Sequence, residues 1–586
     1  TILSLFFFCG SLFSQNEALA RQYFQDGNFK KAVVYYQKLH NENPANILNL
    51  QGLITCYQQL ETYEEAEKLL LNLINSPYYT PVLLVEIGYN YFLQGKQAEA
   101  NRYFEKALQT VAESPAMAYS IGAHLKQKSV LNYAIKVYEK AMELNPGLNF
   151  NYDLALIYGE QGDIENMYNT YLDLIAFKDS YRPNVQRNLG MFISEEPTAE
   201  NNLLLKKILL KKSQTEPNPL WNEMLSWLFI QQKQFNSAFV QEKAILKRTD
   251  NQSVDRMVDL GYEAKQAGDF KIAKEVFTFL NETFKDRSLN LLATENLLEM
   301  EVAEAAPETL AKTAENFEKA LKEFGNNTET LNLQISYANF LAFQQGNTQK
   351  ALALLNSGLQ LPVGKYEEAK IKMAMADILV FDEKHNQAIL YYAQIQKMVK
   401  NDVLSQTARF KEAQTSFYKG DFKWAEDQLK VLKSSTSQLI ANDALQLKLL
   451  ISDNSLQDST HAALKLYAKA HLLGYQNKTP EAIAILDTLL IKHRSESIED
   501  EALLMQAKLF EKQEQFEKAA ENYHKIISFF PSDVLIDDAL FHLAELYANP
   551  LAQPEKAKEF YERIIFNHAD SIFFVEARKK FRKLRG

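Results

Sequence analysis

An alanine recurs every 34 residues in the first part of this chain, at Ala32, Ala66, Ala100 and Ala134. The residues around each alanine are similar, with an apolar and charged stretch that follows a short polar break. Self-similarity at a fixed period of this length indicates a repeat architecture. In such an architecture each unit buries its apolar face against its neighbours, so the whole chain forms an array and not a set of unrelated domains.

The composition indicates which secondary structure the repeats contain. The 586 residues include only 19 glycines and 15 prolines, about 6% together, against roughly 12% in average usage. So few turn-forming residues favour long helices with short connections, and they argue against a sandwich, a barrel or a propeller. A content of 46% apolar and 24% charged residues excludes wholesale disorder.

Other positions repeat in register with the alanines. They are a small residue in the first helix (Ala20, Gly88 and Gly122, with Ile54 as an exception), an aromatic residue in the second (Tyr36, Phe104 and Tyr138), and a closing proline (Pro44 and Pro146). In this pattern the chain resembles the tetratricopeptide repeat family, whose unit is a 34-residue helix–turn–helix. The resemblance implies an all-α fold, a right-handed superhelical solenoid of antiparallel helix pairs.

The register changes along the chain and predicts five segments. From Ala351 to Ala388 and Ala425 the spacing is 37 residues, so longer helices or loops are expected there. The predicted segments are a signal peptide (1–14), a regular 34-residue array (15–180), degenerate helical repeats with a linker near 213–219 (181–250), repeats of longer period (251–450), and C-terminal repeats with a basic end (451–586).

The N-terminal segment predicts export. Residues Ile2–Phe13 are almost all apolar, which is the length of a secretory core and too short to span a bilayer. Cleavage is expected near Gln15. Lipid attachment at Cys9 is disfavoured, because phenylalanines precede it where small residues are expected. The last repeats resemble those of periplasmic assembly and coordinator proteins of Gram-negative envelopes, so we predict a periplasmic location. No later apolar run approaches 18 residues, and no further membrane span is expected.

A constellation for catalysis is not found. The closest approach to a phosphate-binding loop starts at Gly358, but it has five residues between its glycines where the motif has four. The histidines are scattered, so neither a metal ion nor a cofactor is expected. The acidic runs Glu499–Glu501 and Asp537–Asp538 are interpreted as charges that offset the dipoles of helix N-termini. A net charge of −10 disfavours a nucleic-acid partner.

The family resemblance also implies where a partner binds, since first helices line a concave face. Some family members hold a partner's terminal carboxylate with basic residues there. This sequence departs from that pattern, because Val82 and Glu86 stand where basic residues are needed. It offers an aromatic patch with two flanking cations instead, and the candidate residues are Tyr89, Phe92, Tyr119, Tyr152, Arg21 and Lys126. The alternative is that neighbouring repeats cover these rings.

The predicted function is that of a non-catalytic scaffold for protein–protein interactions in the cell envelope. The expected partners are proteins or peptides, with an envelope assembly complex as one candidate. The basic C-terminal segment, from Arg578 to Arg585, is expected to contact an acidic partner or to be solvated cations at a helix C-terminus. Two alternatives stay open: a cytoplasmic adaptor whose first segment is buried, and an accessory subunit that presents substrate to an envelope enzyme.

Overall fold

The computed structural model describes residues 16–216, 218–248, 254–432, 437–455 and 460–585. Every regular element in these ranges is a helix, and no strand occurs in them, so the all-α prediction is confirmed. The predicted signal peptide (1–14), including Cys9, lies outside the described residues. Among the helices that are described, none is both long and apolar enough to cross a membrane.

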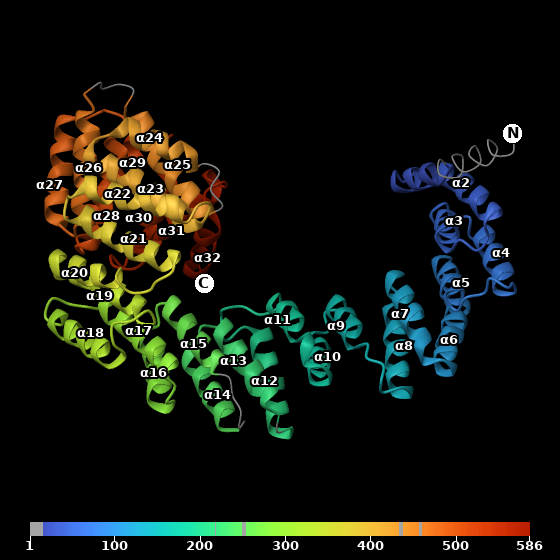
Figure 1. Cartoon of the computed structure of the whole chain (residues 1–586). Helices are drawn as coiled ribbons and strands as arrows, with labels where there is room; N and C mark the ends of the chain where they lie inside the picture. The colour runs from blue at the N-terminus through green and yellow to red at the C-terminus, as the bar shows by residue number, and fades with distance from the viewer. Residues whose placement is uncertain (1–15, 217, 249–253, 433–436, 456–459, 586) are drawn as a thin grey trace, which may run out of the picture. The chain divides into compact units, whose positions relative to one another are not determined.

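The chain divides into two compact units between Ile272 and Ala273. The first unit is a row of helix pairs (Figure 1), and each pair is a first helix followed by a second. They are residues 16–25 with α2 (Phe29–Glu42), α3 (Ile47–Gln59) with α4 (Tyr63–Ile74), α5 (Val82–Leu93) with α6 (Gln97–Glu113), α7 (Ala118–Gln127) with α8 (Leu131–Leu144), α9 (Asn151–Glu160) with α10 (Ile164–Phe177), α11 (Arg182–Gly190) with α12 (Glu200–Thr215), α13 (Pro219–Gln231) with α14 (Phe235–Arg248), and α15 (Asp255–Gln266) with α16 (Phe270–Thr283), in which the division falls.

The second unit continues the same pattern with one exception, the unpaired helix α25. Its helices are α17 (Arg287–Ala303), α18 (Leu310–Phe324), α19 (Leu331–Phe343), α20 (Thr348–Gly358), α21 (Lys365–Phe381), α22 (His385–Met398), α23 (Val403–Lys419), α24 (Phe422–Val431), α25 (Gln438–Asp453), α26 (Ala462–Tyr475), α27 (Thr479–Lys492), α28 (Glu499–Lys512), α29 (Phe516–Phe529), α30 (Ile536–Ala548), α31 (Pro554–Asn567) and α32 (Phe574–Arg585).

The repeating alanines are the core of the array. Each one lies on a second helix, and each is completely buried: Ala32, Ala66, Ala100, Ala134, Ala273, Ala351, Ala388, Ala425, Ala482 and Ala519. Ala238 on α14 is buried in the same way. It lies 35 residues before Ala273, so one regular pair exists inside the segment that the sequence predicted to be degenerate.

The small residues of the first helices allow a close approach of the paired helix. A Cβ atom on Gly122 of α7 would lie 2.4 Å from the Tyr138 ring of α8, and one on Gly88 would lie 2.6 Å from the Phe104 ring. In the second pair both positions are aliphatic, Ile54 and Leu70, and both are buried in one cluster. The exception in the sequence therefore has a reason, because the larger first-helix residue accompanies a smaller second-helix one.

We expect Gly122→Ala to destabilise the protein by about 1 to 3 kcal/mol, because the added methyl group overpacks the contact with Tyr138. The control is Gly190→Ala at the end of α11, where a Cβ atom would meet nothing within 4 Å. That change should be neutral or stabilising by up to about 1 kcal/mol through helix propensity. Urea denaturation of both variants measures the difference. Equal stabilities would contradict the packing assignment.

Left-handed turn residues mark the end of each first helix and record the register. They recur at intervals of 34 residues from Gly27 to Ser129, and of 37 residues from Gly346 to Gly420. The next such residue in the series, Asn477, follows Gly420 by 57 residues, which is one period plus about one helix. This excess corresponds to α25, the helix without a pair.

The predicted linker near 213–219 is the short connection between α12 and α13. The two helices that flank it pack directly against each other. The chain divides into compact units elsewhere, within α16.

Candidate partner-binding surface

The predicted aromatic residues lie on first helices, on the side that no second helix covers. Phe92 of α5 is 46% exposed, Tyr119 of α7 is 60% exposed and Tyr152 of α9 is 38% exposed, while Tyr89 of α5 is half-buried. We call these four residues the aromatic row. The rings are thus not covered by neighbouring repeats, and a partner can reach them.

Each ring of the aromatic row rests on a support of its own. The Tyr89 and Phe92 rings stack with their centroids 6.1 Å apart. The Tyr119 ring packs edge-on against buried Phe150 at 4.7 Å. Tyr152 lies 6.3 Å from the buried ring of Tyr171. The rings are therefore fixed in position along three successive first helices, although they do not form one cluster.

The two candidate cations are placed differently. Arg21 lies in the first described helix, two pairs before the aromatic row, and its guanidinium is 2.5 Å from the Glu17 carboxylate. The structure therefore does not bring Arg21 together with the aromatic row. Lys126 lies on α7, and its charge opposes the effect of burial, which raises the pKa of Asp153 on α9. Lys126 is thus part of the surface.

A buried ionic cluster, which we call the Glu86 cluster, lies beside the aromatic row. Glu86 of α5 is only 2% exposed. Its Oε1 is 2.5 Å from His124 Nε2 and 3.1 Å from Lys128 Nζ, both on α7. Gln58 of α3 donates to the other carboxylate oxygen at 3.4 Å. The sequence analysis noted Glu86 only as a departure from a family pattern; the four-residue spacing of His124 and Lys128 was the available signal.

In the second unit the corresponding surface is closed by the chain itself. The residue two positions before the left-handed turn is aromatic on three first helices: Phe381 of α21, Tyr418 of α23 and Tyr475 of α26. The Tyr475 ring lies 6.5 Å from Phe381 and 6.4 Å from Tyr418. Its hydroxyl donates to the Asp377 carbonyl at 3.2 Å. Helix α26 thereby covers α21 and α23.

In the first unit the same position is mostly polar and open. The residues two before the left-handed turns are Gln25, Gln59, Leu93, Gln127 and Glu160. All of them are exposed except the half-buried Leu93. The first-helix side of the first unit is therefore the accessible surface, and the second unit uses the equivalent surface for its own packing.

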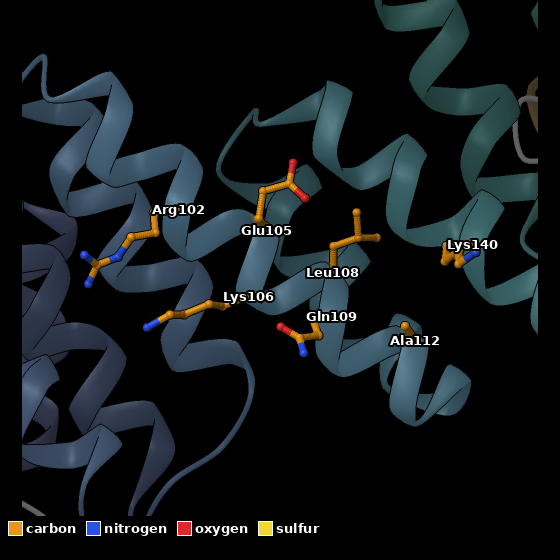
Figure 2. A pocket seen from close by; sticks show the side chains of 7 residues that line it. All are labelled: Arg102, Glu105, Lys106, Leu108, Gln109, Ala112 and Lys140. Carbon is orange, nitrogen blue, oxygen red and sulfur yellow. The ribbon is translucent and has the colours of Figure 1, made fainter.

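A hollow of about 590 Å³ lies elsewhere, on second helices of the first unit (Figure 2). It is lined by α6 residues, among them Arg102, Glu105 and Lys106, and by Lys140 of α8. In Figure 2 the Arg102 and Lys106 side chains extend away from Lys140, so the charged groups do not converge on one point. The hollow offers no arrangement for acid–base or nucleophilic chemistry.

Groups suited to catalysis or metal binding were sought in the described residues. No cluster of three or more His, Cys, Asp or Glu side chains there could hold a metal ion. Cys56 is a buried free thiol, and burial raises its pKa to about 12, so it is not a nucleophile at neutral pH. A lone thiol of this kind fills the core.

The acidic run Glu499–Glu501 lies in the first turn of α28, as the sequence predicted. Two of its members are not solvated charges, however. Asp500 is buried, and burial together with the neighbouring Asp500 carboxyl raises the pKa of Glu501 well above its usual range. One carboxyl of this pair is therefore held protonated at neutral pH, at a cost in stability.

Glu501→Gln should stabilise the protein at pH 8 by about 1 to 3 kcal/mol, because a neutral amide replaces a buried acid group. The folded-state pKa of Glu501 lies above the unfolded value, so the stability of the wild type falls as pH rises between the two. The gain should accordingly shrink toward pH 4. Thermal melts across this range test it, with Glu517→Gln in the first turn of α29, which is exposed, as the control. A gain that is independent of pH would contradict the assignment.

The basic C-terminal segment forms the last helix, α32 (Phe574–Arg585). Its Phe581 and Leu584 pack on the neighbouring core, and Lys580 Nζ pairs with Glu545 at 2.6 Å. The remaining basic residues are exposed on the outer side: Arg578, Lys579, Arg582, Lys583 and Arg585. Three of them lie in the last turn, where cations are favoured by the helix dipole.

Comparisons with known proteins agree with the helix-pair geometry. Models of the tetratricopeptide repeat match residues 23–76 near one end of the chain and residues 501–533 and 538–571 near the other. No curated protein matches this chain.

Two solved structures are similar at low identity. One is the APC/C hetero-tetramer Cut9–Hcn1, with 13% identity, a TM-score of 0.26, and coverage of 91% of this chain and 96% of that chain. The other is Naa15/Naa10 bound to HypK-THB, with 14% identity, a TM-score of 0.29, and coverage of 97% and 96%.

The fold defines a helical-repeat protein in which successive pairs bury one another. The repeat matches at both ends, together with the buried alanines between them, identify the family: the chain belongs to the tetratricopeptide repeat proteins. Proteins with this fold present extended surfaces on which other proteins bind.

Proposed function

We propose that this protein is a non-catalytic scaffold that binds an apolar segment of a partner protein along the first-helix side of its first unit. The observation that supports this most is the contrast between the two units. In the second unit Phe381, Tyr418 and Tyr475 close the surface, whereas in the first unit Phe92 and Tyr119 are left exposed.

Exposed aromatic rings that are held rigidly are effective anchors for a partner. Aromatic residues are enriched among interface residues that dominate binding energy, and they lose little conformational entropy when they are already packed on one side. Phe92 stacks on Tyr89, and Tyr119 rests on Phe150. The exposed cations of α32 form a second contact, with an acidic part of the same assembly.

The proposed place of action is the periplasm, within an envelope complex, after export by the N-terminal segment. The support is the apolar run Ile2–Phe13. A reporter fused to residues 1–20, with a start codon and basic residues restored, should cross the inner membrane. Retention of the reporter in the cytoplasm would favour the adaptor alternative.

The binding proposal is tested by crosslinking and capture from cell envelopes. The double variant Tyr89→Ala/Phe92→Ala should lose the proteins that the wild type captures, since loss of each anchor costs about 2 kcal/mol or more. The control is Phe177→Ala on the second helix α10, where the ring is 54% exposed. It should capture the same proteins as the wild type. Loss of capture in the control, or full capture by the double variant, would refute the assignment of the surface.

A further inference from the structure

The Glu86 cluster joins three successive first helices and is already electrically satisfied. Glu86 of α5 accepts from Gln58 of α3 and pairs with Lys128 of α7. His124, one turn before Lys128, contacts the same carboxylate oxygen. Burial by itself raises the pKa of Glu86, but the His124 hydrogen bond and the Lys128 charge outweigh it and hold the pKa below its usual range. The carboxylate is therefore ionised and serves as the counter-ion of Lys128.

The same ammonium group connects this cluster to the aromatic row. Lys128 Nζ lies 4.9 Å from the centre of the Tyr89 ring, which is within the range of a cation–π interaction. Tyr89 in turn stacks on Phe92. Glu86 thus fixes the position of Lys128, and Lys128 fixes the ring beside which a partner would bind.

We propose that Glu86 determines the charge of the partner segment, so that the surface accepts an uncharged apolar stretch from within a partner chain and rejects a carboxylate. The proposal rests on the binding function proposed above. Its physical basis is charge complementarity: the Lys128 charge is taken up by Glu86, and a second carboxylate beside it would meet a buried negative charge with no free cation. Like charges that are brought together in this way cost affinity and thereby exclude wrong partners.

A matched pair of dyes tests this without knowledge of the partner. N-phenyl-1-naphthylamine is neutral, and 1-anilinonaphthalene-8-sulfonate carries the same ring system with one negative charge. Titrated into the full chain, the neutral dye should bind the wild type, and Phe92→Ala should weaken its binding whereas Phe177→Ala should not. In Glu86→Gln the Lys128 charge is released, so the ratio of anionic to neutral dye affinity should rise about tenfold.

Two further variants keep the test decisive if Glu86→Gln is poorly folded, as judged by circular dichroism. Lys128→Gln keeps the Glu86 carboxylate and should lower the anionic-to-neutral ratio. The double variant Glu86→Gln/Lys128→Gln is neutral and should return the ratio close to the wild-type value. A merely structural role would change both affinities together and leave the ratio unchanged.

The outcomes separate the two proposals. If Phe92→Ala weakens neutral-dye binding but the ratio is the same in the wild type and every Glu86 and Lys128 variant, the charge-selection proposal is overturned while the binding surface stands. If Phe92→Ala alters the binding of neither dye, the surface proposed for the partner is wrong, and the charge-selection proposal fails with it.

Discussion

Phe104→Ala should lower the free energy of unfolding of the first unit by about 3 to 5 kcal/mol. The Phe104 side chain is 1% exposed and fills the space that Gly88 leaves on the facing helix. Its removal leaves a cavity that rigid helices cannot close, so the lost contacts are not recovered. Denaturant unfolding of the full chain, followed by helix signal, measures the change.

The comparison with Phe92→Ala makes this result informative. Phe92 lies on the same helix pair but is nearly half exposed, so its truncation should change stability by about 0.5 kcal/mol. A loss for Phe92→Ala as large as that for Phe104→Ala would mean that the aromatic row is part of the core. The proposed binding surface would then not exist.

Tyr475→Ala should destabilise the second unit by about 3 kcal/mol or more. The ring lies among Phe343, Phe381 and Tyr418, and its hydroxyl is bonded to the backbone of α21. Loss of the ring should also release α26 from α21 and α23, which hydrogen exchange of those helices would detect as faster exchange.

The conservative change Tyr475→Phe separates packing from hydrogen bonding. It keeps the ring and removes only the bond to Asp377, so it should cost about 1 kcal/mol. Equal losses for Tyr475→Phe and Tyr475→Ala would show that aromatic packing does not hold this surface closed.

The sequence predicted the positions that touch only the next helix, because those contacts are local. The 34-residue alanine register places Ala32 to Ala134 against a paired helix, and each of them is buried. The exchange of Gly and aromatic residues for Ile54 and Leu70 was visible as an exception, although its compensating nature required the facing helix to be known. Ala238 was missed because the flanking repeats have irregular spacing.

Contacts between residues far apart along the chain could not be predicted in this way. Tyr475 meets Phe381 across more than 90 residues, and no periodic signal at the repeat length reports such a contact. The insertion of α25 was hidden as a gap of 57 residues between left-handed turns. For the same reason, the predicted linker near 213–219 gave no information about the division at Ile272 and Ala273.

The candidate site was predicted in part. The exposure of Phe92, Tyr119 and Tyr152 follows from their register on the first helix, which a repeat sequence supplies. The pairing of Glu86 with Lys128 depends on the distance between adjacent first helices. The sequence gives no such distance, so the ionic cluster appeared only in the structure.

The most direct test of the account is hydrogen exchange of the full chain with and without a partner obtained by capture. We expect new protection in α3, α5, α7 and α9, centred on the aromatic row, with little change in the second helices α4 to α10 or in α21 to α26. Protection confined to second helices, or to the second unit, would contradict the claim that the open first-helix side of the first unit holds the partner.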